Sequence, residues 1–415
     1  MKISIPNSKT RENLLLTFLI IFKSTQASVL AFTPETTILC LLYAAYVFWK
    51  RGLKLDKFFI PFVLIYSLIQ CYYYVSFGDN DFYLGFYILL KLVYAYLTIK
   101  CVGMDFFACY EKVVYKLAFI SLPLFVIQLI DYDALFKVVG ILQTNIPFLE
   151  YRNDRLANCI VFTLESHGSI TRNSGFAWEP KGFANFLVIA ILINLVNNRF
   201  RYNKRFLILA LALITTTSTV GYLIFFVLIP GLYVFNSKSS KRFLFVIAAI
   251  PVVAGILSLD FGLSKIQKEY DGRNEYKELL ADEREFEQRS LGRFPSFMLD
   301  LQDALKRPLF GYGYNRDERT QSDYTKLVRV NGVSDYFATH GFVGFFLLIL
   351  TYYKSFKSFL SNHNYSGAWI IMLIIISIYF ASTLTSHPFW MIFHFMFLVK
   401  MDPRLLVNKY QTMFR

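Results

Sequence analysis

Apolar runs long enough to cross a lipid bilayer recur along the whole chain, and they limit its fold more than any other feature. Each crossing needs about 20 apolar residues, because the hydrocarbon layer is about 30 Å thick. The 415 residues are 55% hydrophobic and only 17% charged, whereas soluble domains are nearer one quarter charged. The sequence therefore predicts an all-α, polytopic integral membrane bundle.

Length, helix-breaking residues and charge divide these runs into about twelve predicted transmembrane helices. The run 206–236 is too long for one span, and its centre holds a row of threonines and a serine before Gly221. A polar turn there suits two short helices and keeps the basic residues that follow in the cytoplasm. The predicted spans are 14–32, 35–49, 58–77, 82–100, 113–130, 182–197, 206–218, 220–236, 242–260, 336–353, 367–386 and 388–400.

Positive charge is confined to the termini and to alternate connectors. Lysine and arginine gather near 50–57, 199–205, 238–242 and 354–357, while the connectors between these carry acids or no charge. This is the positive-inside pattern, and it predicts that both termini lie in the cytoplasm. The net charge of +14 does not indicate a nucleic-acid partner, because no basic stretch forms a domain of its own. The expected partner is the lipid bilayer.

Two long polar segments, 131–181 and 261–335, interrupt the single membrane domain 1–415 and are predicted to lie outside the cell membrane. The second begins with charges balanced in sign, which is typical of one solvated helix. An amphipathic helix follows, ended by Arg307 and Pro308 before a tight turn. We expect its apolar face to lie on the membrane surface. That face contains Phe294, Phe297, Met298, Leu301, Ala304 and Leu305.

No metal or cofactor site is indicated. Of the five cysteines only Cys159 falls in an external segment, and neither a metal-ligand spacing nor a nucleotide-binding glycine loop occurs. The first apolar run lacks a signal-peptide cleavage site, so we expect it to remain as a membrane anchor.

Residues 172–184 bring two cations and a carboxylate to the start of a predicted span. Charges at the edge of the hydrocarbon are costly without a partner, and an anionic lipid headgroup is one such partner. Arg172 is a candidate anion ligand, with Lys181 and Trp178 beside it. Glu179 is a candidate base, although an acid before Pro180 also suits a helix N-terminus. An ion pair of Arg172 with Glu165 or Glu179 is the structural alternative.

The second external segment supplies further candidates. Arg289 and Arg293 flank a glycine before the amphipathic helix and are candidate phosphate ligands, with surface ion pairs as the alternative. Asp335 and His340, at the start of a span, are candidate proton acceptors. An acid in that place also caps a helix, and a histidine there is often only a packed residue.

Three other side chains complete the candidates. Tyr312, in the tight turn, is a candidate for stacking on substrate. Lys91 lies too deep in its span to reach the surface and is expected to mark a cavity or a buried partner. Lys23, nearer the end of a span, is expected to extend to the membrane surface.

Three patterns resemble bacterial O-antigen and capsular polysaccharide polymerases of the Wzy type and, more distantly, O-antigen ligases. They are Arg-x-x-Gly-x-x-x-Glu-Pro from Arg172, the run from Arg293 through Pro-Leu-x-Gly-x-Gly at 308–313, and Gly341-x-x-Gly344. The resemblance implies a glycosyltransferase-C-like fold in the bacterial inner membrane, with periplasmic loops at 131–181 and 261–335. It also implies metal-independent transfer of a glycan from undecaprenyl diphosphate to another lipid-linked oligosaccharide, with a chain-length regulator and a flippase as partners.

The candidate residues suit such chemistry. A lipid diphosphate needs fixed cations, and the arginine fork matches phosphate oxygens. The same cations stabilise the charge that grows on the leaving oxygen. The incoming hydroxyl needs a base, for which Glu179, Asp335 and His340 all remain open.

One departure from the resemblance bears on the choice between a polymerase and a ligase. Ligases, and many of their relatives, carry a His-Asn pair about ten residues before the first glycine of the third pattern, whereas this chain has Val330 and Asn331 there. The missing histidine favours a polymerase over a ligase, and His340 does not occupy the matching position. A transporter or flippase of lipid-linked sugars, or a structural membrane scaffold, are the alternatives from other classes.

Overall fold

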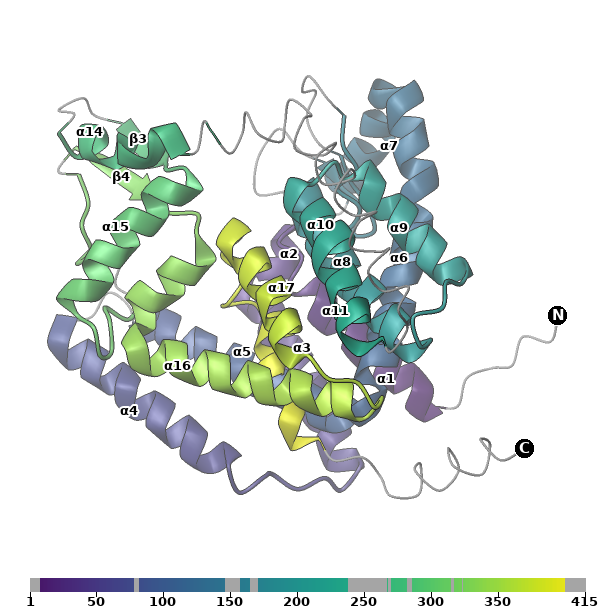
Figure 1. Cartoon of the computed structure of the whole chain (residues 1–415), viewed down its shortest axis with the longest axis horizontal. Coiled ribbons are helices and arrows are strands. Elements are labelled where there is room, and N and C mark those ends of the chain that lie inside the picture. Colours follow the sequence, from purple (N-terminus) through teal and green to yellow (C-terminus); the bar gives the residue numbers. More distant parts are fainter. Residues whose placement is uncertain are drawn as a thin grey trace.

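The computed structural model describes residues 8–77, 82–145, 157–164, 171–237, 267, 270–281, 286–314, 317–322 and 324–399. Within these ranges the chain is mostly helical (Figure 1). Five helical stretches are long and apolar enough to cross a membrane: 59–77, 83–130, 180–197, 219–236 and 332–361. The prediction of a helical protein with membrane-crossing segments is confirmed at that level. The full span count stays a prediction, because 242–260 lies outside the described residues.

The N-terminal helices are α1 (Ser8–Phe22), α2 (Val29–Phe32), α3 (Pro34–Lys50), α4 (Phe59–Phe77), α5 (Phe82–Val102) and α6 (Phe106–Ile130). The predicted span 14–32 is wrong, because the helix stops before Lys23. The Lys23 side chain is buried, and its Nζ donates to the carbonyl oxygens of Leu30 and Thr33 at 3.1 Å each. Lys23 therefore satisfies the open end of α2 and does not extend to the surface, contrary to expectation.

The middle of the chain forms α8 (Pro180–Asn197), α9 (Lys204–Thr215), α10 (Thr219–Leu223), a π-helical turn (Ile224–Leu228) and α11 (Ile229–Asn236). Apart from Lys181 and Asn197, every residue of α8 is buried, so this helix lies at the centre of the bundle. The predicted break between two helices is confirmed. Thr217 has a φ of 46°, and the Ser218 hydroxyl accepts from the Gly221 amide at 3.3 Å.

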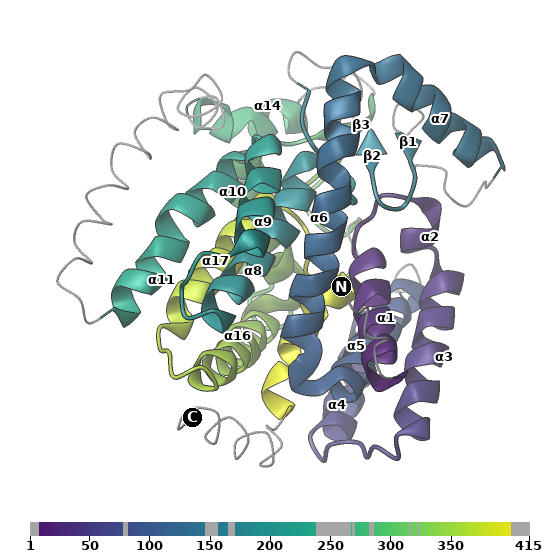
Figure 2. The same cartoon turned by 90° about the vertical axis from the view of Figure 1, so that its right-hand side faces the viewer.

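The two long polar segments contain α7 (Tyr132–Asn145), the antiparallel strands β1 (Ala157–Asn158) and β2 (Thr163–Leu164), α14 (Glu275–Ala281), and the parallel strands β3 (Phe286–Ser290) and β4 (Thr325–Val328). The single solvated helix expected from the balanced charges is wrong. Tyr276 and Leu279, which lie among these charged residues in the sequence, are buried. They pack beside Leu291, Leu299 and Leu327 in a small separate core. In Figures 1 and 2, α7 and α14 lie at the same end of the molecule.

The predicted amphipathic helix is confirmed as α15 (Arg293–Lys306). Its polar side is the one that packs against the protein, since Ser296, Asp300 and Asp303 are fully buried. Met298 and Leu305, on the apolar side, remain 38% and 64% exposed. These two side chains thus point outward, whereas Ala304 on the same predicted face is fully buried. Contact of this face with a membrane stays a prediction.

The C-terminal part contains α16 (Gly332–Ser361), α17 (Ala368–Ala381), α18 (Pro388–Met391) and the 3-10 turns Ile392–His394 and Met396–Leu398. The predicted helical span 388–400 is wrong over its described part. This segment forms short turns, and Phe389, Trp390 and Phe393 are buried among the surrounding helices. Apolar composition alone does not separate a buried turn from a spanning helix.

Candidate functional site

The segment before α8 is held rigidly by backbone hydrogen bonds. The Asn173 side chain donates to the Thr215 hydroxyl at 2.9 Å, and its amide donates to the Thr215 carbonyl at 3.0 Å. The Trp178 amide donates to the Thr25 carbonyl at 3.1 Å. These bonds tie the segment to the end of α9 and to the turn after α1, so side chains at 172, 179 and 181 start from a fixed backbone.

Two glycines of the first pattern have a packing reason. Gly175 has a φ of 48°, and a Cβ there would lie 2.6 Å from the Phe183 ring. A Cβ on Gly182 would lie 2.8 Å from the ring of Trp178. Both positions need glycine, because the rings fill the space that a side chain would occupy. Trp178 is therefore part of this packing as well as a neighbour of the candidate charges.

Glu179 and Lys181 form an ion pair, with 3.0 Å between Oε1 and Nζ. Their side chains are 37% and 25% exposed, so the pair borders the surface. Glu179 occupies the N-cap position of α8, but its side chain makes no cap hydrogen bond. Arg172 is half-buried in the same segment, and its alternative partner Glu165 lies outside the described residues.

The end of α17 joins α8, which follows this segment, to α15 and α16. The Asn185 side chain on α8 donates to the Ser382 hydroxyl at 3.5 Å. The Phe380 ring contacts Phe294 at a centroid distance of 5.6 Å. Gly332, which begins α16, lies so close to the Ser382 carbonyl that no side chain fits there. The N-terminal ends of α8, α15 and α16 therefore meet around residues 380–382.

A buried network of ion pairs locks α15 to α16 and β4. The Arg329 Nη1 atom lies 2.7 Å from Asp300 and 2.6 Å from Asp303. The Arg319 Nη1 atom lies 2.7 Å from Asp335 and 3.8 Å from Asp300. Both aspartates on α15 are fully buried, and each arginine is at most 5% exposed. Loss of one partner would leave a buried charge without compensation, so the network fixes the place of α15.

Burial sets the protonation behaviour of this network. Desolvation and the neighbouring Asp335 carboxylate raise the pKa of Asp300 to about 6, against the lowering effect of Arg329 and Arg319. Burial alone would lower the pKa of Arg329, but Asp300 and Asp303 outweigh it and raise the pKa above the ordinary value. Asp335, a candidate base from sequence, is engaged by Arg319 in this network.

The turn 308–313 and the segment 338–343 of α16, which belong to the second and third sequence patterns, are hydrogen-bonded to each other. α16 is kinked at Gly341, whose φ is 61°. The amides of Tyr312 and Gly313 donate to the carbonyls of Ala338 and Thr339 before the kink, at 3.0 and 2.9 Å. After the kink, the amides of residues 342 and 343 donate to the carbonyls of residues 308 and 309. The turn 308–313 thus supplies the hydrogen bonds that the broken helix lacks.

The remaining candidates are spread over three places. Arg293 starts α15, where its carbonyl accepts from the Asn331 side chain at 3.4 Å, and Arg289 pairs with Leu327 between β3 and β4. Tyr312 is buried against Phe77, and its amide is one of those that join the turn 308–313 to α16. His340 lies against Tyr314 and Tyr336 and lines an apolar cavity beside α4.

Lys91 is apart from the other candidates. Its Nζ lies 4.2 Å from the centre of the Tyr87 ring on the same helix, and the Tyr87 hydroxyl lies 3.0 Å from the Thr37 hydroxyl of α3. In the part of the chain that the structure describes, no carboxylate pairs with Lys91. Lys91, which the sequence predicts to lie deep in its span, is therefore placed against Tyr87 of α5 on the side of that helix that contacts α3.

Comparison with known proteins identifies no relative: no family model matches the chain, and no curated protein is significantly similar to it. The likeness to polysaccharide polymerases therefore rests on the three short patterns and their order. In the described ranges, no three His, Cys, Asp or Glu side chains are grouped closely enough to hold a metal ion.

Four members of the buried network were not among the sequence candidates: Asp300, Asp303, Arg319 and Arg329. The available signal is the i, i+3 spacing of the two aspartates, which places both on one side of α15. This spacing does not indicate burial by itself, because charged residues are rarely fully buried unless they are paired. The arginine partners lie 16 or more positions further along the chain, beyond the reach of helical periodicity.

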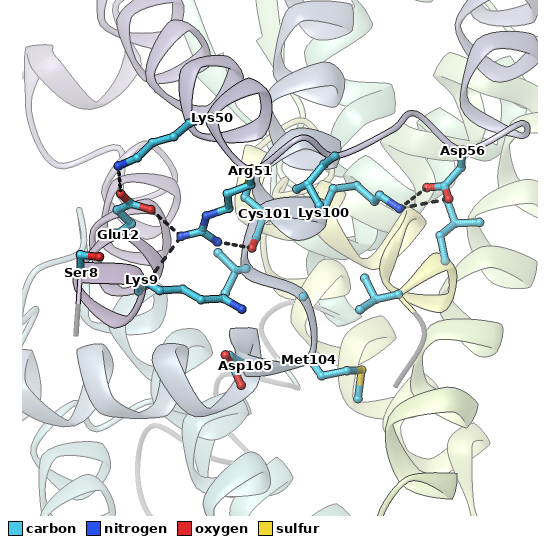
Figure 3. Close-up of a pocket in the computed structure, with 15 residues that line it drawn as sticks. Ser8, Lys9, Glu12, Lys50, Arg51, Asp56, Lys100, Cys101, Met104 and Asp105 are labelled. Atoms are coloured by element: carbon cyan, nitrogen blue, oxygen red, sulfur yellow. Dashed lines mark hydrogen bonds and ion pairs between the residues drawn. The ribbon is translucent and has the colours of Figure 1, made fainter. Parts of the chain in front are cut away.

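A polar pocket of about 880 Å³ lies where the N-terminal helix, the α3–α4 connector and the α5–α6 connector meet (Figure 3). Glu12 bridges Lys50 and Arg51 there, at 2.7 Å to each. Lys100 lies 3.1 Å from Asp56. These three connectors are the ones predicted to be cytoplasmic, and none contributes a residue to the site around 380–382.

Proposed function

We propose that this protein is a polysaccharide polymerase of the bacterial inner membrane, acting at the periplasmic face. It transfers a growing glycan from undecaprenyl diphosphate onto another lipid-linked repeat unit. The observation that supports this most directly is the convergence of two segments on residues 380–382. One is α8, which reaches Ser382 through Asn185 and begins beside Glu179 and Lys181, and the other is the start of α15, which reaches Phe380 through Phe294, next to Arg293.

In the proposed reaction, a hydroxyl of the acceptor sugar attacks the anomeric carbon of the donor glycan. The new carbon–oxygen bond forms as the bond to the diphosphate breaks, and the lipid diphosphate leaves with the electron pair. The arginines stabilise the charge on the leaving diphosphate. Glu179, whose carboxylate pairs with Lys181 at 3.0 Å, accepts the hydroxyl proton, since its side chain is partly exposed and makes no cap hydrogen bond.

The network at Arg319 and Arg329 has a positioning role in this proposal. It holds α15 and therefore the backbone of Arg293. Asn331, at the place where ligases carry His-Asn, accepts from the amides of Val333 and Ser334 and begins α16. This use of Asn331 as a helix cap, together with Val330 in place of histidine, favours polymerase over ligase.

A flippase or transporter of lipid-linked sugars is the second candidate. The observation that favours it is Lys91, a cation within the membrane-crossing part of α5. Such cations mark substrate pathways in many transporters.

Deletion of the gene in its host, with surface polysaccharide separated on a gel, distinguishes the candidates. A polymerase predicts loss of the ladder with single repeats retained on lipid A. Loss of all repeats from lipid A while lipid-carrier-linked polymer accumulates would indicate a ligase instead. Accumulation of unpolymerised repeats on the cytoplasmic side would indicate a flippase.

A further inference from the structure

A narrow apolar cavity of about 210 Å³ follows one face of α4. Its lining residues on this side run from Phe58 to Tyr73, and 15 residues of helix correspond to about 22 Å. The volume holds roughly seven water-sized groups. A mostly apolar cavity of this volume suits part of one hydrocarbon chain. Its far wall is the part of α16 around His340, Val343 and Leu347.

This slot opens sideways, onto the outer surface of the helical bundle. Ile65 on α4 and Leu347 on α16 both line it, yet they remain 56% and 44% exposed. Their neighbours Leu64 and Phe346 are 59% and 65% exposed, which makes the surrounding surface apolar. Since α4 and α16 are both long and apolar enough to cross a membrane, the opening faces lipid chains.

A cation lies at one end of the slot. The Arg307 guanidinium lies 4.3 Å from the centre of the Phe77 ring and 5.2 Å from that of Tyr312. The adjacent turn is joined to α4, because the Tyr73 hydroxyl donates to the Phe310 carbonyl and both residues line the slot. Arg307 is exposed, and among the described residues it is paired with no carboxylate.

Lys306, the neighbouring cation, is already engaged. Its Nζ lies 3.6 Å from Asp303 and donates to the Thr320 hydroxyl at 2.9 Å. Arg307 therefore provides one positive charge that an external anion can neutralise, held by two aromatic rings at the end of an apolar slot.

We propose that the slot binds one acyl chain of an anionic membrane phospholipid, with the lipid phosphate on Arg307. A phosphodiester carries one negative charge, which a single guanidinium matches, whereas a diphosphate needs more cations. The site is also separate from the proposed reaction centre. Arg293 and Arg307 stand at opposite ends of α15, about 20 Å apart, so the inference does not depend on the polymerase proposal.

Bound lipid has a structural consequence. Phe310, Tyr314 and His340 form part of the slot and of the interlocked turn at the α16 kink. A lipid chain against these residues stabilises the turn, and through it the junction between α15 and α16.

The test is native mass spectrometry of the purified full-length protein in detergent, titrated with phosphatidylglycerol, phosphatidylcholine or undecaprenyl phosphate. Phosphatidylglycerol is expected to bind best at one site. Arg307→Ala should weaken it about tenfold or more, since a charge-assisted phosphate contact contributes about 1.5–3 kcal/mol. Lys306→Ala should change it less than about threefold.

The slot is tested with a matched pair of variants. Ile65→Trp fills the opening and should abolish one-site binding, whereas Leu64→Trp, on the next exposed residue, should not. Size-exclusion profiles and thermal unfolding of both variants establish that they fold alike. Equal phosphatidylglycerol binding in the two tryptophan variants overturns the proposal. So does equal weakening by Arg307→Ala and Lys306→Ala, or tighter binding of undecaprenyl phosphate than of phosphatidylglycerol.

Discussion

Replacing Arg329 with methionine should destabilise the 267–335 region strongly. Arg329 lies 2.7 Å from Asp300 and 2.6 Å from Asp303, and both carboxylates are fully buried. The partners that remain are Arg319, at 3.8 Å from Asp300, Lys306, at 3.6 Å from Asp303, and the hydroxyls of Ser334 and Thr320. Breaking a buried pair in this way costs about 3–5 kcal/mol. If the region opens locally, its open population rises by roughly 100- to several-thousand-fold.

The assay is the rate of cleavage by trypsin at low protease concentration, where cleavage follows the population of the open form. Lys326→Met, on the strand that precedes Arg329, is the control, because the Lys326 side chain is 58% exposed and lies 3.9 Å from an exposed Asp317. An exposed pair of this kind contributes at most about 1 kcal/mol. Adding Asp303→Asn to Arg329→Met should recover part of the resistance. Cleavage of Arg329→Met no faster than Lys326→Met would refute the reasoning.

Four further results are expected. Burial raises the pKa of Asp300 from 3.8 to about 6, so the folded region holds this proton more tightly than the unfolded chain. The thermal stability of the wild-type protein, measured relative to that of Asp300→Asn, should therefore fall from about pH 4 to pH 6 and then level off. Arg172→Ala and Arg293→Ala should abolish polymer in cells at normal protein levels, and lysine at either position should rescue poorly, because one ammonium does not reproduce the arginine fork. Glu179→Gln should remove nearly all activity if the carboxylate takes the proton, whereas an active Gln variant would make Glu179 structural. Gly341→Ala should lose about 1–3 kcal/mol or more of stability in thermal unfolding, since its φ is 61° and a Cβ would press on the Leu309 backbone; Gly140→Ala, in open space on α7, is its control.

Helices whose ends are set by local chemistry could be predicted from the sequence. Pro34 and Pro180 sit at the first positions of α3 and α8, where proline is tolerated because its missing amide has no helical partner anyway. The polar turn between α9 and α10 is confirmed for the same reason, since Ser218 bonds to the Gly221 amide in its own sequence neighbourhood. Local rules suffice at such places.

Features that depend on distant partners could not be predicted. Lys23 is buried because α2 presents open carbonyls to it, and nothing in the first apolar run indicates that turn. Asp300 and Asp303 face inward because Arg319 and Arg329 return from a later segment. The kink at Gly341 is likewise completed by a turn about 30 residues earlier in the chain.

The candidate site was predicted in its residue types and only partly in its geometry. The sequence indicated Arg172, Glu179 and Lys181 as neighbours, and the ion pair of the last two is observed. Asp335 is a candidate proton acceptor or helix cap by sequence, and in the structure its carboxylate lies 2.7 Å from Arg319. His340 was expected beside the external charges, whereas it lies against the apolar slot.

The most direct test of the central claim is polymerisation by the purified protein in liposomes. The substrate is the host's own repeat unit linked to undecaprenyl diphosphate, and the products are separated by size. The proposal predicts a ladder of lengthening lipid-linked glycans, with release of one undecaprenyl diphosphate for each repeat added, and no ladder from Arg172→Ala. Release of no undecaprenyl diphosphate, with the substrate recovered unchanged or moved across the bilayer, would contradict it.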